Sequence, residues 1–298
     1  MKRFLKSNNY NYYYKYSLKK ETTIKCIEKC KYFVIVNNYQ ELYKLLDYLN
    51  NKKIKYLIIG NGSKLVFTKN YKGVVISLKK LNKLTIGKNV IVEAGCLIPN
   101  LINKLKKYNL GGIEELIGIP CSIGGGLVNN ISAHKVCLSD YLIKVLVYQN
   151  GEIKELNRDE ISFNYHSSSL NNLVVLKAFF NFKKEELIII DNNIKKYRNY
   201  RLEHQEIKYP SIGSIFKNKD QPAYQIIKEC QLENFKYKNI ALSQKHLNFF
   251  KIKGKVKGKN IYKFVKKIEQ KIYKIKKIQV ESEINFIKWK LDIKNRYI

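Results

Sequence analysis

Over the first 80 residues, short apolar runs of strand length occur before and after a segment whose apolar residues have helical spacing. Four mostly apolar runs have the length of buried strands: 31–36, 55–59, 65–68 and 73–78. Between the first two, four leucines fall on one helix face: Leu42, Leu45, Leu46 and Leu49. Asn38 precedes them with Glu41 three residues on, which is the spacing of a capping box. This pattern predicts a small α/β lobe that ends near residue 80.

A second lobe is predicted from the pattern that follows. Residues 83–95 indicate a hairpin, and Pro99 suits the first turn of a helix with an apolar stripe. Gly111-Gly112 is expected to end that helix. Asn150-Gly151 joins two β runs, which is a strong hairpin signal, and residues 174–182 predict a further strand.

The rest of the chain predicts a helical connector and a smaller domain. Residues 185–204 are expected to be helical, and further elements follow at 222–232 (helix), around Ala241 and Phe249 (strands) and at 259–276 (helix). The last strand, 278–288, has a period of two. One face carries Ile278, Val280, Ile284 and Phe286, so that Glu281 and Glu283 point the other way. The predicted class is α+β.

Two glycine-rich segments lie next to predicted strands. GNGS (60–63) follows the apolar run that ends at Ile59, and GIPCSIGGGLVNN (118–130) contains three consecutive glycines. Glycine permits positive φ and a close approach to the backbone, and such a loop can point several N–H groups at one anion. Glycine-rich loops also serve as plain turns. The pair nevertheless suggests a ligand with a diphosphate.

The formal net charge of +33 invites a nucleic-acid function, but the composition argues against one. Only five of the 57 basic residues are arginine, the residue that selected nucleic-acid surfaces use for bidentate contacts. Lys, Asn, Ile and Tyr are abundant from end to end, and they share A/T-rich codons. A base-composition bias is the simpler explanation, so nucleic acid is not the expected main partner. The charge would still attract anionic substrates.

Cysteine spacing and hydropathy predict a cytoplasmic protein. The six cysteines form no CxxC pair and no Cys/His ligand set, so no metal site is expected and the thiols should be reduced. No apolar run approaches the roughly 18 residues that span a bilayer. The basic N-terminus lacks the apolar segment of a signal peptide. The oligomeric state does not follow from the sequence.

Four ordered segments resemble the motifs of one family. GNGSKLVF (60–67) resembles GxGSNLL, and GIPCSIGGGLVNN (118–130) resembles GIPGSVGGAxxMN. PSIGSIFKN (210–218) resembles PSAGSVFKNP, and VESEI (280–284) resembles LEPEV. These are motifs of the UDP-N-acetylenolpyruvoylglucosamine reductase (MurB) family. The resemblance spans nearly the whole chain, and the length of 298 residues resembles the shorter type of that family.

The resemblance implies a fold and an activity. It implies a two-lobed FAD-binding domain of the vanillyl-alcohol-oxidase type over residues 1–186, with the lobe boundary near 80. Residues 187–298 would hold the connector and a C-terminal substrate domain. The implied enzyme is a UDP-N-acetylmuramate dehydrogenase of peptidoglycan precursor synthesis. NADPH reduces FAD, which then reduces the enolpyruvyl group of UDP-N-acetylglucosamine enolpyruvate, a UDP-sugar.

Site residues follow from the same resemblance, position by position. FAD contacts are implied for Gly60, Asn61, Gly62, Ser63, Lys64, Leu65, Gly118, Ile119, Pro120, Ser122, Ile123, Gly124, Gly125 and Asn130. Ser214 is implied to donate a proton to the substrate carbanion, with Glu283 as the acid beside it. Tyr165, Lys217 and Asn218 are implied to lie near substrate. Without the resemblance, Ser214 would be an ordinary turn residue and Glu283 a solvated carboxylate.

The chain departs from the family at several positions. The family has Phe-x-Tyr-Arg where this chain has Phe163 to His166, so a histidine replaces the third catalytic residue. Arginine is always charged, whereas histidine is only partly charged near neutral pH. Either His166 acts as an imidazolium, or it is a tolerated replacement and another cation such as Lys217 does the work. Ile27-Glu28 stand where the family has two glycines, and Ile131, Ser132, His134 and Lys135 also differ from its motif.

Two alternatives to the reductase stay open from these departures. One is an FAD-holding relative with reduced or lost turnover. The other is a different FAD-dependent oxidoreductase on the same fold. NADPH oxidation that depends on the enolpyruvyl substrate would separate all three.

Overall fold

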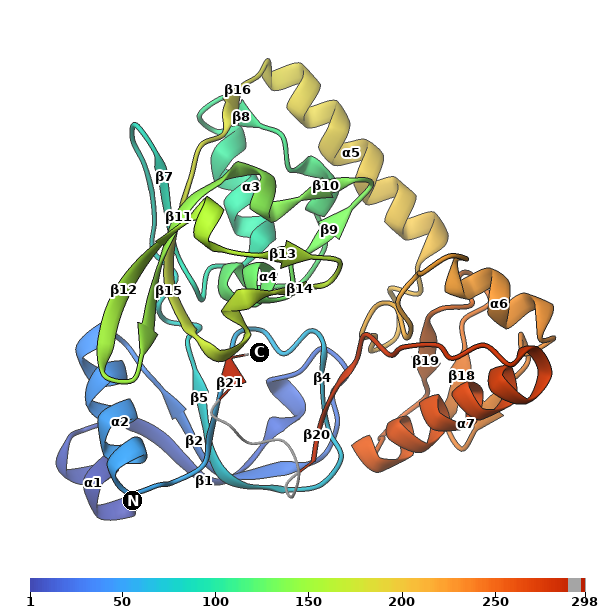
Figure 1. Cartoon of the computed structure of the whole chain (residues 1–298), viewed down its shortest axis with the longest axis horizontal. Helices are drawn as coiled ribbons and strands as arrows, with labels where there is room; N and C mark the ends of the chain where they lie inside the picture. The colour runs from blue at the N-terminus through green and yellow to red at the C-terminus, as the bar shows by residue number, and fades with distance from the viewer. Residues whose placement is uncertain (289–295, 298) are drawn as a thin grey trace.

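The computed structural model describes residues 1–288 and the backbone of residues 296–297. Figure 1 shows three parts, which we call the first lobe (residues 1–80), the second lobe (81–186) and the C-terminal domain (205–288). The long helix α5 (Leu187–His204) runs from the second lobe to the C-terminal domain.

The first lobe is built on a mixed five-stranded sheet. The order is β1 (Asn11–Ser17), β2 (Lys29–Ile35), β5 (Tyr71–Ser77), β3 (Tyr56–Ile59) and β21 (Arg296–Tyr297). β1 is antiparallel to β2, and the other neighbours are parallel. Helices α1 (Lys2–Ser7) and α2 (Tyr39–Asn51) belong to this lobe. α2 starts at the predicted cap, where Asn38 Oδ1 accepts the Glu41 N–H at 2.8 Å, but the Glu41 carboxylate accepts the Asn37 N–H rather than the Asn38 N–H of a capping box.

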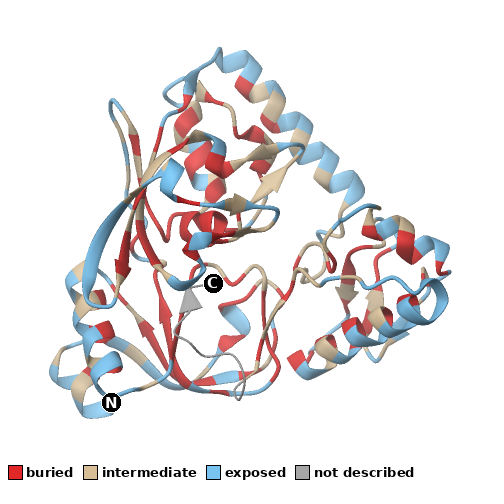
Figure 2. Cartoon of the chain, viewed as in Figure 1, coloured by how far each residue is buried: buried red, intermediate tan, exposed pale blue. Residues whose placement is uncertain are grey.

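Burial on both faces explains the apolar runs of this sheet. On β5, Val74 and Ile76 pack in the core that contains the α2 leucines. Val75 belongs to a second core with Phe33 and Leu57. Successive side chains of a strand point to opposite faces, so each of these residues serves one core or the other. Figure 2 shows the buried residues concentrated in these strands and in the helix faces turned toward them.

The second lobe has a five-stranded antiparallel sheet. Its order is β12 (Glu152–Asn157), β11 (Leu142–Gln149), β15 (Val174–Phe180), β7 (Val90–Glu93) and β6 (Leu84–Ile86). Helices α3 (Ile98–Lys106) and α4 (Ile123–Val128) accompany it. Short two-stranded pairs complete the lobe: β8 (Leu110–Gly111) with β16 (Lys183–Lys184), β9 (Ser132–Ala133) with β10 (Val136–Cys137), and β13 (Phe163–Asn164) with β14 (Ser167–Ser168).

The C-terminal domain returns the chain to the first lobe. It contains α6 (Ala223–Glu229), the antiparallel strands β17 (Lys236–Tyr237), β18 (Ile240–Leu242) and β19 (Phe250–Ile252), and α7 (Gly258–Lys276). The apolar face predicted for α7 is buried in a core that this domain shares with Ile24, Cys26 and Val66 of the first lobe. Strand β20 (Asn285–Ile287) then pairs in parallel with β4 (Leu65–Phe67). That pairing places residues near 283 beside residues near 64.

Three local predictions were wrong. α3 ends at Lys106 rather than at Gly111-Gly112, because Asn109 adopts the left-handed conformation (φ 54°) and turns the chain. The glycine triplet 124–126 is the body of helix α4 rather than a loop. The last strand spans only 285–287: Ile278 is exposed, and Glu281 and Glu283 lie in different surroundings.

Candidate active site

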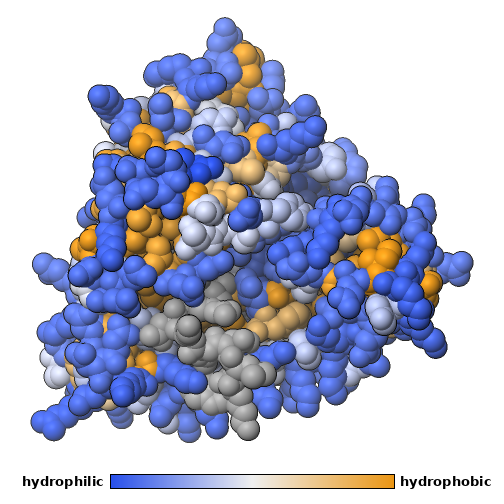
Figure 3. Space-filling view, viewed as in Figure 1, coloured by the Kyte–Doolittle hydropathy of each residue, from blue (hydrophilic) through white to orange (hydrophobic). Residues whose placement is uncertain are grey.

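A cavity of about 780 Å³ lies where the two lobes, α5 and the C-terminal domain meet. Both glycine-rich segments line it, together with residues of the second lobe such as Tyr165, of α5 such as Arg201 and of the C-terminal domain such as Ser214. Its polar wall residues include Asn61, Ser63, Lys64, Ser122, Tyr165, His166, Arg201, Ser214, Asn218 and Glu283. Figure 3 shows hydrophilic side chains spread over all three parts of the molecule around this region.

The first glycine-rich segment supplies unpaired backbone donors to the cavity. It follows β3, and Gly62 takes a positive φ of 60°. A Cβ at Gly62 would lie 2.2 Å from the backbone oxygen of Glu21, so no side chain fits there. The N–H groups of Asn61, Gly62 and Ser63 donate to no acceptor in residues 1–288. Consecutive unpaired amides of this kind suit an anion such as a diphosphate.

The second segment forms a wall rather than an anion loop. Ser122 caps α4 by accepting the Gly125 N–H at 3.4 Å. The N–H groups of Ile123 and Gly124 are already bonded to the carbonyls of Cys96 and Ala94. The backbone amides that are available to bind an anion are therefore those of residues 61–63 and not those of the glycine triplet.

Gly125 has no side chain and leaves this part of the cavity wall open to a ligand. A Cβ there would meet only Ser122 Oγ at 3.4 Å and Cys121 Sγ at 3.7 Å, which are ordinary contacts. Gly60, by contrast, approaches so closely that a Cβ would lie 1.9 Å from Ser122 Oγ. Asn61 Nδ2 also donates to the Pro120 carbonyl at 2.9 Å, which ties the two segments together. A bulky ligand can therefore lie flat against Gly125.

Most of the predicted cofactor residues lie at this cavity, and four do not. Gly60, Ile123, Gly124 and Asn130 are not among the described residues that line it. Asn130 is buried: its Nδ2 donates to the Asn164 carbonyl at 3.0 Å, and its Oδ1 accepts the Ser139 hydroxyl at 2.7 Å. Both polar atoms of the Asn130 side chain are therefore engaged within the second lobe. The unpaired amides, the bare face at Gly125 and the cavity volume together fit a bound dinucleotide.

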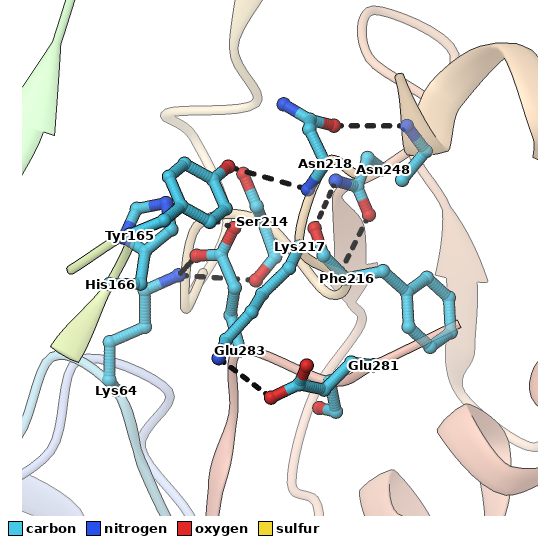
Figure 4. A network of polar contacts seen from close by, with 12 residues as sticks. Lys64, Tyr165, His166, Ser214, Phe216, Lys217, Asn218, Asn248, Glu281 and Glu283 are labelled. Carbon is cyan, nitrogen blue, oxygen red and sulfur yellow. Dashed lines mark hydrogen bonds and ion pairs between the residues drawn. The ribbon is translucent and has the colours of Figure 1, made fainter. Parts of the chain in front are cut away.

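Lys64, His166, Ser214 and Glu283 converge at one end of the cavity and form what we call the carboxylate cluster (Figure 4). Lys64 Nζ lies 2.6 Å from Glu283 Oε2 and donates to the Ser214 carbonyl at 3.1 Å. His166 Nε2 lies 3.7 Å from the other carboxylate oxygen, Glu283 Oε1. The Glu283 side chain is only 6% exposed, so the prediction of its burial beside Ser214 fits and a solvated carboxylate does not.

Backbone pairing holds the Ser214 segment against the Glu283 segment. The Glu283 N–H donates to the Ile215 carbonyl at 2.9 Å, and the Ile215 N–H donates to the Asn248 carbonyl at 2.8 Å. The Asn248 side-chain amide also bonds both the N–H and the carbonyl of Phe216. No sequence motif pointed to Asn248, because its partner lies 32 residues away.

His166 occupies the turn between β13 and β14 with a positive φ of 51°. Its pKa is lowered from the usual value, mainly because burial penalises the imidazolium. Glu283 raises that pKa, and the charges of Lys64 and Lys217 lower it further. The imidazole is therefore mostly neutral at neutral pH. The hydroxyl of its neighbour Tyr165 accepts the Asn218 N–H at 3.3 Å across the cavity.

Lys217 points away from this cluster. Its Nζ lies 2.6 Å from Glu281 Oε1, and the ammonium lowers the pKa of that carboxyl. Lys217 is absent from the described cavity wall, whereas its neighbour Asn218 is part of it. The Asn218 Oδ1 accepts the Ala223 N–H at 2.9 Å and so anchors the start of α6.

Arg201 is a cavity residue that sequence reasoning missed. It lies on α5, and its Cδ would be 3.1 Å from a Cβ at Gly118, whose φ is +81°. Its guanidinium donates to Gln205 Oε1 at 3.1 Å, and burial lowers its pKa. The rarity of arginine in this chain was the one available signal.

Neither a metal-binding group nor a membrane-spanning helix occurs among the described residues. No group of three or more His, Cys, Asp or Glu residues there could hold a metal ion. No helix within that part of the chain has the length and apolarity to cross a membrane.

Comparisons with known proteins identify both halves of the chain. The model of an FAD binding domain matches residues 30–157, and that of the UDP-N-acetylenolpyruvoylglucosamine reductase C-terminal domain matches residues 205–287. The reductase of Carboxydothermus hydrogenoformans is 31% identical over 91% of this chain and 92% of its own. That of Prochlorococcus marinus is 32% identical over 92% of this chain and 96% of its own. The crystal structure of the Thermus caldophilus reductase superposes with a TM-score of 0.79, at 24% identity over 93% of this chain and 98% of that one.

Proposed function

The chain belongs to the UDP-N-acetylenolpyruvoylglucosamine reductase family, and we propose that it is a UDP-N-acetylmuramate dehydrogenase that uses FAD and NADPH. The predicted family and fold class are confirmed: an FAD-binding domain of the vanillyl-alcohol-oxidase type with the family's C-terminal domain. We propose that residues 1–186 form the FAD-binding domain and that residues 187–298 hold the connector and the C-terminal domain. The substrate is a UDP-sugar that carries an enolpyruvyl group.

One arrangement supports this proposal more than any other. Ser214 and Glu283 come from the C-terminal domain, yet they lie in the wall of the cavity that both glycine-rich segments of the lobes also line. We propose on this basis that Ser214 is the proton donor beside the flavin site. A protein that only binds FAD does not need a buried carboxylate in contact with a lysine at this position.

The FAD diphosphate is proposed to bind the amides of Asn61, Gly62 and Ser63, and the dinucleotide to pack against Gly125. Lys64, Leu65, Gly118, Ile119, Pro120 and Ser122 complete the proposed contacts. FAD held by these residues would supply hydride transfer from NADPH to the enolpyruvyl alkene.

The residues of the cluster handle the proton and the charge. Hydride arrival on the terminal carbon leaves negative charge on the neighbouring carbon and its carboxylate. The Ser214 hydroxyl donates the proton to that carbon, which completes the lactyl ether of UDP-N-acetylmuramate. Glu283 orders the Ser214 segment through its own backbone N–H, which donates to the Ile215 carbonyl. Tyr165 and Asn218 are proposed to border the substrate.

A flavin-binding relative without turnover remains the second candidate, because His166 replaces the family's arginine. The test is purified protein assayed for bound FAD and for NADPH oxidation with and without the enolpyruvyl substrate. The reductase requires both bound FAD and NADPH oxidation that depends on the enolpyruvyl substrate. Bound FAD without substrate-dependent oxidation would favour the second candidate, and substrate-independent oxidation would favour another oxidoreductase of this fold. The six cysteines are free, which accords with a proposed cytoplasmic location.

A further inference from the structure

Resting on the proposed function, we propose that Lys64 is a positioning residue that supplies the permanent positive charge of the carboxylate cluster during substrate reduction. This lysine acts through Glu283 and the Ser214 segment. The residue at position 166 does not carry that charge at neutral pH.

Lys64 contacts two groups of the cluster at once. It lies on the loop before β4, and its ammonium reaches Glu283 Oε2 at 2.6 Å and the Ser214 carbonyl at 3.1 Å. Two of its three N–H donors are thus used, and its side chain is 28% exposed to the cavity. The Glu283 side chain is only 6% exposed, and a nearby cation offsets the cost of burying a carboxylate. Lys64 therefore fixes both the carboxylate and the proton donor's backbone.

No other described basic residue is placed to do this. The basic residues with an ion pair to Glu283 are Lys64 and His166. Burial favours neutral imidazole in His166, while Lys217 is engaged by Glu281. Tyr165 is the remaining titratable group whose charge interacts with Glu283. The replacement cation that the sequence suggested as Lys217 is thus a different lysine.

The two departures from the family motifs meet on one carboxylate. Lys64 stands where the GxGSNLL motif has asparagine, and His166 stands where Phe-x-Tyr-Arg has arginine. Lys64 contacts one oxygen of Glu283 and His166 faces the other. The positive charge that the family has at position 166 is missing there, and a positive charge that the family lacks is present at position 64. The cluster thereby keeps a permanent cation, delivered from the first lobe instead of the second.

A double-mutant cycle tests the proposal. The variants are Lys64→Asn, His166→Arg and both together, with flavin reoxidation by the enolpyruvyl substrate followed in stopped flow after NADPH reduction. Lys64→Asn should slow reoxidation about 10²-fold, a typical loss for one positioned charge donor. Flavin reduction by NADPH should change little. Adding His166→Arg to Lys64→Asn should restore most of the lost rate, because the permanent charge returns to the same carboxylate.

The pH profile separates a charge role from a structural one. With Lys64 present, reoxidation should stay flat as pH rises through the range below 6.5 where His166 loses its proton. In Lys64→Asn the rate should fall over that range, since only protonated His166 remains beside Glu283. A wild-type rate that itself falls tenfold there would overturn the proposal. That wild-type measurement does not depend on whether any variant folds.

Matched controls keep the outcomes distinct. Lys144→Asn removes a lysine that pairs with Glu155 outside the cavity, so it should leave every rate unchanged. Lys64→Arg should retain activity, and Lys64→Gln serves if Lys64→Asn loses its flavin. Substrate-dependent reoxidation in wild type with an equal rate in both neutral variants overturns the role of Lys64 alone. Absence of any substrate-dependent reoxidation in wild type overturns the proposed function and this inference with it.

Discussion

Ser214 is the residue on which the proposed chemistry depends most. Its segment is held by the Ile215 and Phe216 hydrogen bonds to Asn248 and by Glu283, so removing its hydroxyl should leave that frame intact. Ser214→Ala should bind FAD and accept hydride from NADPH at the normal rate. Reoxidation by substrate should slow by about 10²–10⁴, the usual loss for a positioned proton donor. Stopped flow on the two half-reactions measures this directly.

The control for Ser214 is its neighbour in the same motif. Ser211→Ala removes a hydroxyl that accepts only the Gly213 N–H among described residues, at 3.2 Å. It should lose far less of the reoxidation rate than Ser214→Ala. Equal rates for Ser214→Ala and wild type in both half-reactions would mean that Ser214 is not the donor.

At the scale of elements, helix α4 shows how a glycine segment serves packing and binding at once. A Cβ at Gly126 would press on Ile131, Leu138 and Ile98 at 3.1–3.3 Å, while one at Gly125 meets nothing closer than 3.4 Å. Gly125→Val should therefore fold but bind FAD about tenfold or more weakly, because overpacking a binding surface costs about 1–3 kcal/mol. Flavin titration monitored by absorbance gives the affinity.

Gly126→Ala is the matched control on the same helix. It should lower the melting temperature through the tight core contacts while FAD affinity stays close to wild type below that temperature. Unchanged FAD affinity in Gly125→Val would show that α4 does not contact the flavin nucleotide.

Local patterns were predictable from the sequence, and long-range placement was not. The Asn38 cap and the apolar faces of α2 and α7 depend on residues a few positions apart, and the structure has them as predicted. The glycine triplet has poor helix propensity, but tertiary burial overrides that propensity. Periodicity placed Glu281 and Glu283 on one face. Lys64 could be found as a partner only once β20 was paired with β4, and Lys217 only once Phe216 was paired with Ser282.

At the scale of the whole molecule, the first lobe and the C-terminal domain contact each other directly, and Glu28 makes one of these contacts. Its Oε1 accepts the Gly258 N–H at the start of α7 at 2.9 Å, and the neighbouring Ile27 N–H donates to the Val256 carbonyl. The Glu28 side chain, which stands where the family has a glycine, thus contributes to this contact. Neither residue lies in the described cavity wall.

Glu28 should make the stability of the molecule depend on pH. Burial raises the pKa of Glu28 above 4.5, and its Oε2 has no partner within residues 1–288. In the pH range between the unfolded and the raised folded pKa, the folded state binds a proton that the unfolded state does not. The contribution of the protonated Glu28 to the free energy of unfolding is therefore fully present below pH 4.5, and it is lost as the pH rises through the pKa of Glu28 in the folded state. Glu28→Gln, which stays neutral, should be more stable than wild type at neutral pH by about 1–3 kcal/mol.

Urea unfolding at several pH values measures this effect. The advantage of Glu28→Gln over wild type should grow as pH rises and vanish at low pH. Glu155→Gln changes an exposed carboxylate and should show no such trend. A Glu28→Gln protein that is less stable than wild type at neutral pH would show that the carboxylate charge supports the interface.

The most direct test of the proposed reductase is a single turnover without oxygen. The protein with bound FAD is bleached by one equivalent of NADPH and then mixed with UDP-N-acetylglucosamine enolpyruvate. We expect the yellow colour to return and one UDP-N-acetylmuramate to form for each flavin, as identified by mass spectrometry. A flavin that stays bleached with this substrate and recovers its colour only when oxygen is admitted would contradict the proposed function.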